Sequence, residues 1–145
     1  MSFPLRGLWG MVEGMKHALA LILSLAAAPL MAADGMSAAE FEAYVEDKTL
    51  YFGMSGQPYG AERYLDDRRV TWSFLDGDCK DGYWYEDAGQ ICFVYEDRPD
   101  PQCWAFYREG SGLRAEFAGD PTSTVLYEAR QSDEPMLCYG PEVGV

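Results

Sequence analysis

The sequence predicts a mainly β protein: a single small antiparallel up-and-down sheet or barrel, either lipocalin-like or a strongly curved open sheet, with one short N-terminal helix. Between Gly82 and Tyr107, large apolar side chains recur at every second position. This period of two is typical of strands that bury one face. Similar short segments recur about every 8–12 residues. The connections between them are short, which favours pairing of sequential strands.

The predicted helix covers about residues 37–46. Ser37 and Glu40 have the S-x-x-E spacing of a capping box, in which the two side chains satisfy backbone N–H groups of the first turn. Apolar residues follow at the spacing of one helix face, at Phe41, Tyr44 and Val45. We expect this face to plug one end of the sheet or to cover one side of it.

Eight strands are predicted after the helix, at residues 49–53, 59–65, 69–75, 83–86, 90–95, 102–108, 113–118 and 124–129. The third has the clearest alternation, with Val70, Trp72 and Phe74 on one face. The pairs Asp76-Gly77 and Asp81-Gly82 predict turns, because Gly accepts the positive φ of tight turns. Residues 96–101 are predicted to connect the fifth and sixth strands.

A secretory leader is predicted near the start of the chain. A short basic segment at Met15–His17 precedes an apolar run at residues 18–30, and small residues follow. We interpret residues 15–33 as a signal peptide, and residues 1–14 as a mis-assigned start or an extended n-region. Residues 34–145 are then a single disulfide-stapled β domain without a membrane span, located in the periplasm or secreted.

The composition is strongly acidic, with 24 Asp and Glu residues against 11 Lys and Arg residues and a formal net charge of −13. Removing the leader changes this charge to −14, because Arg6, Lys16 and Glu13 precede residue 34. An acidic surface repels phosphate backbones, so nucleic acid is disfavoured as a partner. Solubility explains the charge by itself, and a basic protein partner is the alternative.

All four cysteines lie after the leader: Cys79, Cys92, Cys103 and Cys138. An even number in a short exported chain indicates disulfides. Zinc is disfavoured, because the intervening segments hold 12, 10 and 34 residues and form no C-x₂-C pair. If segments 90–95 and 102–108 form a hairpin, Cys92 lies opposite Cys103 on the face away from the core. Cys79 then pairs with Cys138, which is one of three connectivities that four cysteines allow.

No catalytic residue, metal site or cofactor is predicted. The one histidine, His17, lies in the leader, so the mature domain has no Ser-His-Asp, Cys-His or His-dependent metal site. Residues 76–82 resemble a calcium loop, but Lys80 occupies the third ligand position and breaks the D-x-D-x-D-G frame. Adjacent carboxylates lie at predicted turns, where such residues are usually solvated. They are Asp66 and Asp67, Glu86 and Asp87, and Glu96 and Asp97.

Aromatic side chains are the remaining candidates for a site. The ten Tyr residues and the Trp residues after the leader exceed what a core of this size must bury. In a barrel mouth such rings can stack on a ligand, and the alternative is that they fill the core with their hydroxyls at the rim. The candidate ligand-binding residues are Trp72, Trp84, Tyr85, Trp104 and Tyr107.

A wider pattern, G-x-W…G-x-x-C-F…C-W, is formed by Gly82, Trp84, Gly89, Cys92, Phe93, Cys103 and Trp104. With this pattern, and with Lys48-Thr49-Leu50 after the helix, the chain resembles small exported alphaproteobacterial proteins of unknown function. The similarity covers most of residues 37–108. It implies export and a compact β domain, and it carries no activity or functional residue with it.

These observations favour an exported, non-catalytic β domain that binds a small apolar or aromatic ligand. The alternative is an acidic interaction module that binds a basic partner, such as a lysozyme-like enzyme, with salt-sensitive affinity. A carboxylate-based hydrolase is a third hypothesis, and it requires two carboxyls that converge in a cleft.

Overall fold

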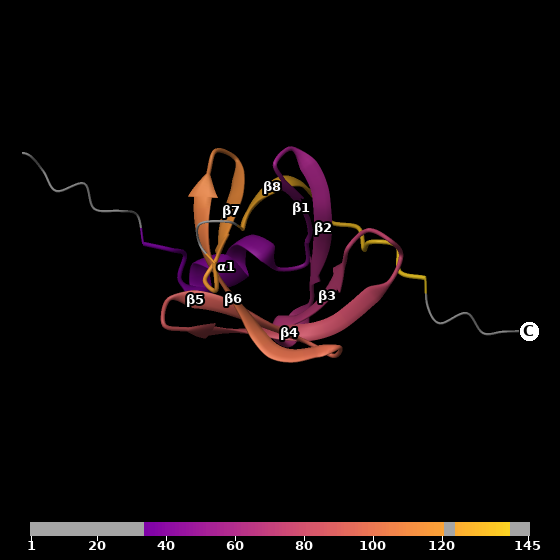
Figure 1. Ribbon diagram of the computed structural model, residues 1–145, viewed down its shortest axis with the longest axis horizontal. Helices are drawn as coiled ribbons and strands as arrows, with labels where there is room; N and C mark the ends of the chain where they lie inside the picture. Colours follow the sequence, from indigo (N-terminus) through magenta and orange to yellow (C-terminus); the bar gives the residue numbers. More distant parts are fainter. Residues whose placement is uncertain (1–33, 121–123, 140–145) are drawn as a thin grey trace, which may run out of the picture. The chain divides into compact units, whose positions relative to one another are not determined.

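Eight antiparallel strands close into a barrel in the computed structural model, which describes residues 34–120 and 124–139 (Figure 1). The elements are α1 (Ala38–Val45), β1 (Thr49–Met54), β2 (Gln57–Tyr64), a 3₁₀ turn η1 (Asp66–Arg68), β3 (Arg69–Ser73), β4 (Cys79–Asp87), β5 (Gln90–Tyr95), β6 (Arg98–Glu109), β7 (Gly112–Phe117) and β8 (Val125–Ser132). The predicted leader, and the residues before it, lie outside the described residues.

The predicted fold class is confirmed. Each strand pairs with its neighbours in sequence, and β8 pairs with β1 to close the barrel, so the alternative of an open sheet is not adopted. In the described part of the chain, no helix has both the length and the hydrophobicity needed to cross a membrane.

Because neighbouring strands are antiparallel, the connections between them alternate between the two ends of the barrel. The β1–β2, β3–β4, β5–β6 and β7–β8 connections lie at one end, called the open end below. The β2–β3, β4–β5 and β6–β7 connections lie at the other end, together with α1, and this is called the helix end. The guanidinium of Arg68, in the β2–β3 connection, donates to Glu42 Oε2 of α1 at 3.2 Å.

Phe41 of α1 plugs the barrel at the helix end, as the first of the two predicted arrangements requires. Its side chain is fully buried. Its ring centroid lies 5.7 Å from that of Tyr64, 5.2 Å from that of Trp84 and 4.5 Å from that of Phe106. The predicted capping box starts the helix, because Ser37 Oγ accepts from Glu40 N at 3.2 Å and Glu40 Oε2 accepts from Ser37 N at 2.8 Å.

Tyr44, one turn further along α1, attaches the helix to the barrel wall. Its hydroxyl donates to Glu128 Oε2 at 2.6 Å, and the guanidinium of Arg108 lies 4.4 Å from its ring centroid. Burial, followed by the hydrogen bond to Glu128, raises the pKa of Tyr44 to about 12. The phenol therefore stays protonated and keeps this hydrogen bond at physiological pH.

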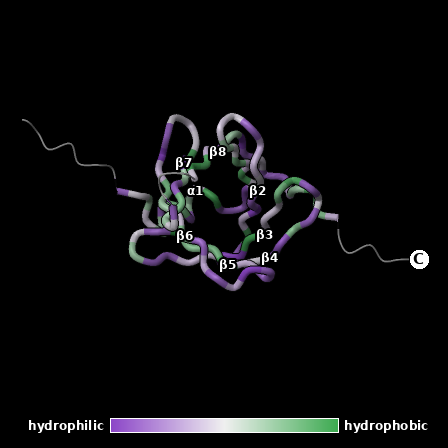
Figure 2. The backbone as a smooth tube through the Cα atoms, viewed as in Figure 1, coloured by the Kyte–Doolittle hydropathy of each residue, from purple (hydrophilic) through white to green (hydrophobic). Residues whose placement is uncertain are grey.

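Inward-facing side chains form the core, and hydrophobic and hydrophilic positions alternate along the strands (Figure 2). A β-bulge interrupts this alternation between β1 and β2, because Phe52 pairs with Gly60 whereas Gly53 pairs with Pro58. Tyr59 is therefore an extra residue on β2 and points into the barrel along with Glu62 and Tyr64.

Two predicted connections are wrong. The Asp81-Gly82 pair lies inside β4, where Gly82 pairs with Val70, and it forms no turn. Gly is needed there for close packing, since a Cβ would overlap the Val94 carbonyl oxygen and crowd the Tyr95 ring. Similarly, residues 96–101 are not all loop: Tyr95 pairs with Arg98, so the turn is reduced to Glu96-Asp97 and β6 begins at Arg98.

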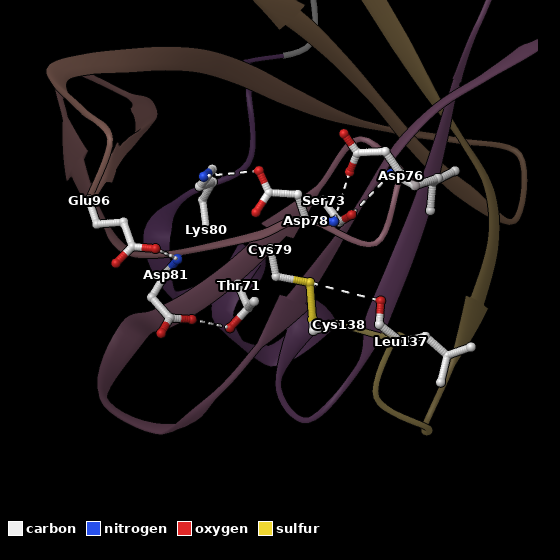
Figure 3. Close-up of a disulfide and its surroundings, with 11 residues drawn as sticks. Thr71, Ser73, Asp76, Asp78, Cys79, Lys80, Asp81, Glu96, Leu137 and Cys138 are labelled. Carbon is white, nitrogen blue, oxygen red and sulfur yellow. Dashed lines mark hydrogen bonds and ion pairs between the residues drawn. A yellow bond between two sulfur atoms is a disulfide. The ribbon is translucent and has the colours of Figure 1, made fainter. Parts of the chain in front are cut away.

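Both predicted disulfides are present and use all four cysteines. Cys92–Cys103 joins directly paired residues of β5 and β6, whose Cα atoms lie 3.9 Å apart. Cys79–Cys138 joins the start of β4 to the segment after β8, with Cα atoms 5.5 Å apart (Figure 3). Disulfides of this number in a small domain are typical of an oxidising, non-cytoplasmic environment.

Replacing Phe41 with Ala is expected to lower the free energy of unfolding by about 3–5 kcal/mol, because the lost ring leaves a cavity inside the barrel. Urea unfolding followed by tryptophan fluorescence measures this change. Leu137→Ala is the control, because that side chain is 79% exposed, and it should change stability by less than about 0.5 kcal/mol. Equal losses in the two variants would contradict the role of Phe41 as a plug.

The two disulfides are expected to contribute unequally to stability. On the chain-entropy model, Cys92–Cys103 is worth about 3 kcal/mol and Cys79–Cys138 about 4 kcal/mol. The difference arises because the bridged residues are 11 and 59 positions apart. Urea unfolding of the double variants Cys92→Ala/Cys103→Ala and Cys79→Ala/Cys138→Ala tests the order. A larger loss for the shorter loop would contradict it.

Candidate functional site

A cavity of about 100 Å³ lies inside the barrel between the helix plug and the open end. Its inner part is formed by Tyr64, Phe93 and Phe106, the same rings that contact Phe41. Its outer part is formed by residues at the open end, including Phe74 and Arg98. The cavity is therefore closed at the helix end and approached from the open end.

Most of the cavity wall is apolar. Besides the residues named above, it contains Phe52, Tyr59, Trp72, Tyr95, Trp104, Ala115 and Leu126. The aromatic rings near the open end contact one another edge to face: the ring centroids of Trp72 and Phe74 lie 5.4 Å apart, and those of Tyr59 and Phe74 lie 5.8 Å apart. Such a wall favours apolar or aromatic groups, and the faces of its rings also attract cations.

Gly60 on β2 makes room for part of this wall. It faces the interior beside β3, and a Cβ at this position would overlap the indole ring of Trp72. The absence of a side chain at Gly60 lets the indole approach the β2 backbone closely. The width of the cavity therefore depends on a glycine as well as on the aromatic rings.

Glu62 on β2 places a carboxyl group in this apolar wall. Its side chain is 2% exposed, and it lies between its cross-strand partners Leu50 and Trp72. The hydroxyl of Tyr95 donates to Glu62 Oε2 at 2.9 Å. Glu62 Oε1 has no hydrogen-bond partner in the part of the chain that the structure describes. The carboxyl of this cavity-lining residue thus has one buried, unsatisfied oxygen.

Burial shifts the protonation of this group and its neighbours. It raises the pKa of Glu62 well above 4.5, and the hydrogen bond from Tyr95 offsets only part of this effect. Burial, followed by the charge of Glu62, also raises the pKa values of Tyr64 and Tyr95. Both phenols therefore remain neutral donors beside the carboxyl at physiological pH.

Charged residues surround the mouth of the cavity at the open end. Lys80 and Arg98 line it, but the Lys80 ammonium lies 3.1 Å from Asp78 Oδ2 and is already paired (Figure 3). The β5–β6 turn is held to β4, because Glu96 N donates to the Asp81 carbonyl at 2.9 Å and Glu96 Oε1 accepts from Asp81 N at 3.3 Å.

Two of the five predicted ligand-binding residues, Trp72 and Trp104, line the cavity. Trp84 also points inward, but it packs against Phe41 at the helix end and is not part of the cavity wall. Tyr85 and Tyr107 lie on the outer face of the barrel, the latter with the guanidinium of Arg114 4.7 Å from its ring centroid. These three residues therefore belong to the plug or to the outer surface.

Sequence reasoning missed Glu62, Tyr95 and Tyr59. The sequence contains a weak signal for Glu62. On a regular strand, Gly60, Glu62 and Tyr64 face one side, and Tyr59, Ala61 and Arg63 face the other. The charged residues Glu62 and Arg63 lie on opposite faces of this strand, so the pattern alone does not indicate which face points into the barrel. The bulge at Tyr59 obscures the pattern further, because residues from both faces of the regular strand then point inward.

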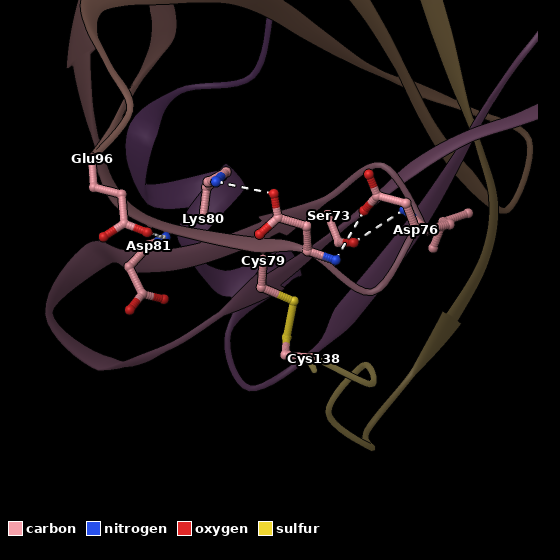
Figure 4. Close-up of polar contacts among 9 residues, drawn as sticks. Ser73, Asp76, Cys79, Lys80, Asp81, Glu96 and Cys138 are labelled. Atoms are coloured by element: carbon pink, nitrogen blue, oxygen red, sulfur yellow. Dashed lines mark hydrogen bonds and ion pairs between the residues drawn. A yellow bond between two sulfur atoms is a disulfide. The ribbon is translucent and has the colours of Figure 1, made fainter. Parts of the chain in front are cut away.

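The acidic segment from Asp76 to Gly82 forms a turn followed by the start of β4. Asp76 Oδ1 accepts from Asp78 N at 2.9 Å, and Asp81 Oδ1 accepts from Thr71 Oγ1 at 2.8 Å. With the Asp78–Lys80 pair, each of these carboxylates has a partner within the protein (Figures 3 and 4). Within residues 34–120 and 124–139, no group of three or more His, Cys, Asp or Glu residues is arranged to hold a metal ion.

Comparisons with known proteins found no match: no protein-family model, no curated protein and no solved structure matches this chain. The function is therefore inferred from the cavity and its surroundings.

The free energy of unfolding of the wild-type protein is expected to fall as pH rises, because Glu62 is buried. The variant Glu62→Gln is expected not to show this fall. The folded-state pKa of Glu62 lies above the unfolded value near 4.5. The stability contributed by its protonated form is therefore complete below about pH 4.5 and is lost as pH rises through the folded-state pKa. Across that window, the free energy of unfolding of Glu62→Gln relative to wild type should grow by at most about 1.4 kcal/mol per pH unit.

Urea unfolding of both proteins at a series of pH values measures this difference. Glu46→Gln, at an exposed carboxyl after α1, is the matched control and should show no comparable pH-dependent gain. A constant difference between Glu62→Gln and wild type from pH 4 to pH 8 would show that Glu62 is not buried as an isolated carboxyl.

Proposed function

We propose that this chain is an exported, non-catalytic binding protein whose barrel interior holds a small apolar or aromatic ligand. The observation that best supports this function is the unpartnered Oε1 atom of Glu62 in an aromatic cavity. A buried polar group without a partner costs about 1–3 kcal/mol. A barrel interior that served stability alone would gain by an apolar residue at this position. A ligand that supplies the missing partner explains why a carboxyl is present.

The size of the cavity limits the ligand. At about 100 Å³, it is smaller than the roughly 150 Å³ cavity that accepts a benzene ring. The interior therefore accepts a very small molecule or one end of a larger one. A second depression of about 370 Å³ at the same end shares Tyr59, Arg98, Gln102 and Trp104 with the cavity. It provides space for the rest of a larger ligand.

A location in the periplasm or outside the cell is part of this proposal. Two disulfides that use all four cysteines support an oxidising compartment. The leader pattern at residues 15–33 supports export by the secretory route. A soluble carrier of small molecules is consistent with the strong negative charge, which keeps proteins apart in solution.

1-Butanol is expected to bind in the barrel interior with weak affinity, and phenol and indole are expected to bind with one end of the molecule inside it. Trp72 and Trp104 line the cavity, whereas Trp84 does not, so the three indole N–H signals in an NMR titration of residues 34–145 report the location. At least one probe should shift the signals of Trp72 and Trp104 more than that of Trp84. Saturable shifts confined to Trp84, or no shifts with any probe, would contradict interior binding and favour the acidic interaction module.

The variant Ala115→Leu provides a second test, because the added carbons fill the cavity that Ala115 lines. It should lower the affinity for each bound probe about tenfold or more. Ala129→Leu adds the same carbons at an exposed position of β8 and is the matched control. Equal affinities in the two variants would place the probes outside the barrel.

A further inference from the structure

The interior of the barrel and its mouth both hold acidic residues. Glu62 lines the cavity described above and is 2% exposed. At the open end, the β3–β4 and β5–β6 connections and the first residues of β4 and β6 carry Asp76, Asp78, Glu96, Asp97 and Asp100 against Lys80 and Arg98. An excess of acidic groups at a mouth attracts cations and repels anions.

Resting on the proposed function, we propose that the ligand is a protonated primary organic amine, whose ammonium group enters the cavity and donates to the free Oε1 atom of Glu62. Tyr95 occupies Oε2 and leaves Oε1 for a second donor. An ammonium group supplies up to three N–H donors as well as the opposite charge. A neutral alcohol supplies one donor and no charge.

The aromatic wall suits a cation as well as an apolar group. Trp72 is the direct cross-strand neighbour of Glu62, and the Tyr95 hydroxyl is bonded to Oε2, so an indole and a phenol lie beside this residue. Ring faces attract an ammonium group, and this attraction is strongest where water is excluded. A carboxylate and aromatic faces together therefore select an amine over a neutral molecule of the same shape.

Lys80 does not oppose this assignment, although it lines the cavity. Its ammonium group is paired with Asp78 Oδ2 at 3.1 Å, and its side chain is 32% exposed. Arg98 lies at the start of β6, in the wall of both the cavity and the neighbouring depression, at the mouth. The cationic side chains thus lie near the entrance, while the interior carboxyl is matched by no cation of the described chain.

The cavity volume also restricts the amine. About 100 Å³ accommodates an ammonium group and a short carbon chain, and a longer or aromatic remainder extends to the depression at the open end. A primary amine on an alkyl arm satisfies both conditions. The chemical class is therefore an alkylamine or arylalkylamine with an unbranched amino end.

Binding of the amine is coupled to loss of a proton from Glu62. Burial raises the pKa of this carboxyl, so below that pKa the empty protein holds it in the neutral form. The other titratable groups that line the cavity are Tyr64, Tyr95, Lys80, Asp97 and Arg98, and the two phenols remain neutral. An ammonium ion pairs with the carboxylate, and the carboxyl proton is released to solvent. Amine affinity should therefore rise with pH up to the pKa of Glu62.

The test compares three four-carbon probes of equal shape: n-butylamine, 1-butanol and butyrate. Each is titrated into residues 34–145 at a series of pH values from 5 to 8, with the indole N–H signals of Trp72 and Trp104 as the readout. Butylamine should bind about tenfold more tightly than 1-butanol, because the hydrogen bond to a carboxylate is charge-assisted on both sides. Its affinity should increase with pH, whereas that of 1-butanol should not.

Variants assign the effect to Glu62. Glu62→Gln should lose the tenfold preference for butylamine and its pH dependence, while its affinity for 1-butanol changes by less than about twofold. Glu46→Gln removes one negative charge at the helix end and should keep both properties. If Glu62→Gln does not fold, the comparison of butylamine with 1-butanol on the wild-type protein still decides the proposal.

Three outcomes would overturn the proposal and are distinguishable from one another. Equal binding of butylamine and 1-butanol would leave the apolar binding function intact and exclude an amine as the ligand class. Tighter binding of butyrate would assign recognition to Lys80 and Arg98 at the mouth. No binding of any probe would reject the proposed function together with the amine.

Discussion

The insertion of Phe41 into one end of the barrel is the contact on which the rest of the structure depends. An eight-stranded barrel has an interior just wide enough to be filled by side chains or to hold one small ligand. Phe41 fills the helix end by contacting Tyr64, Trp84 and Phe106. Phe41 fills only the helix end. Toward the open end, the side chains of the strands leave a cavity.

The capping box and Tyr44 fix the position of α1 and therefore of Phe41, the plug. Ser37 and Glu40 fix where α1 begins, and Tyr44 bonds Glu128 one turn after Phe41. The floor of the cavity is therefore held by hydrogen bonds at both ends of a short helix. At the other end, the Cys79–Cys138 bridge and the two hydrogen bonds between Asp81 and Glu96 hold the connections around the mouth. A site with fixed walls loses less conformational entropy on binding a ligand.

The carboxyl of Glu62 weakens the barrel and gives the cavity its chemical character. One oxygen is satisfied by Tyr95 and the other is buried without a hydrogen-bond partner among the described residues, which is unfavourable for the empty protein. Proteins often retain such local costs at sites where a ligand removes them. The acidic composition, which by itself indicates only solubility, acquires a more specific meaning when carboxylates also surround the entrance to that cavity.

The sequence by itself determined the local elements of this protein. The S-x-x-E spacing located the helix, the alternation of Val70, Trp72 and Phe74 assigned their common face, and the hairpin register paired Cys92 with Cys103. These features depend on residues that are neighbours in the chain or across one turn. Alternation also argued against naming both Trp84 and Tyr85 as ligand-binding residues, because adjacent strand residues face opposite sides.

Closure of the barrel, the inward position of Glu62 and the outline of the cavity were decided only by the tertiary structure. The pairing of β1 with β8 joins segments far apart in the chain, and no local pattern distinguishes it from an open sheet. The bulge at Tyr59 changes which residues of β2 face inward. Gly82 illustrates the same limit: its role is the close approach of Val94 and Tyr95, which belong to a neighbouring strand. A glycine that serves packing and a glycine that serves a turn look alike in sequence, because the contact that separates them exists only after folding.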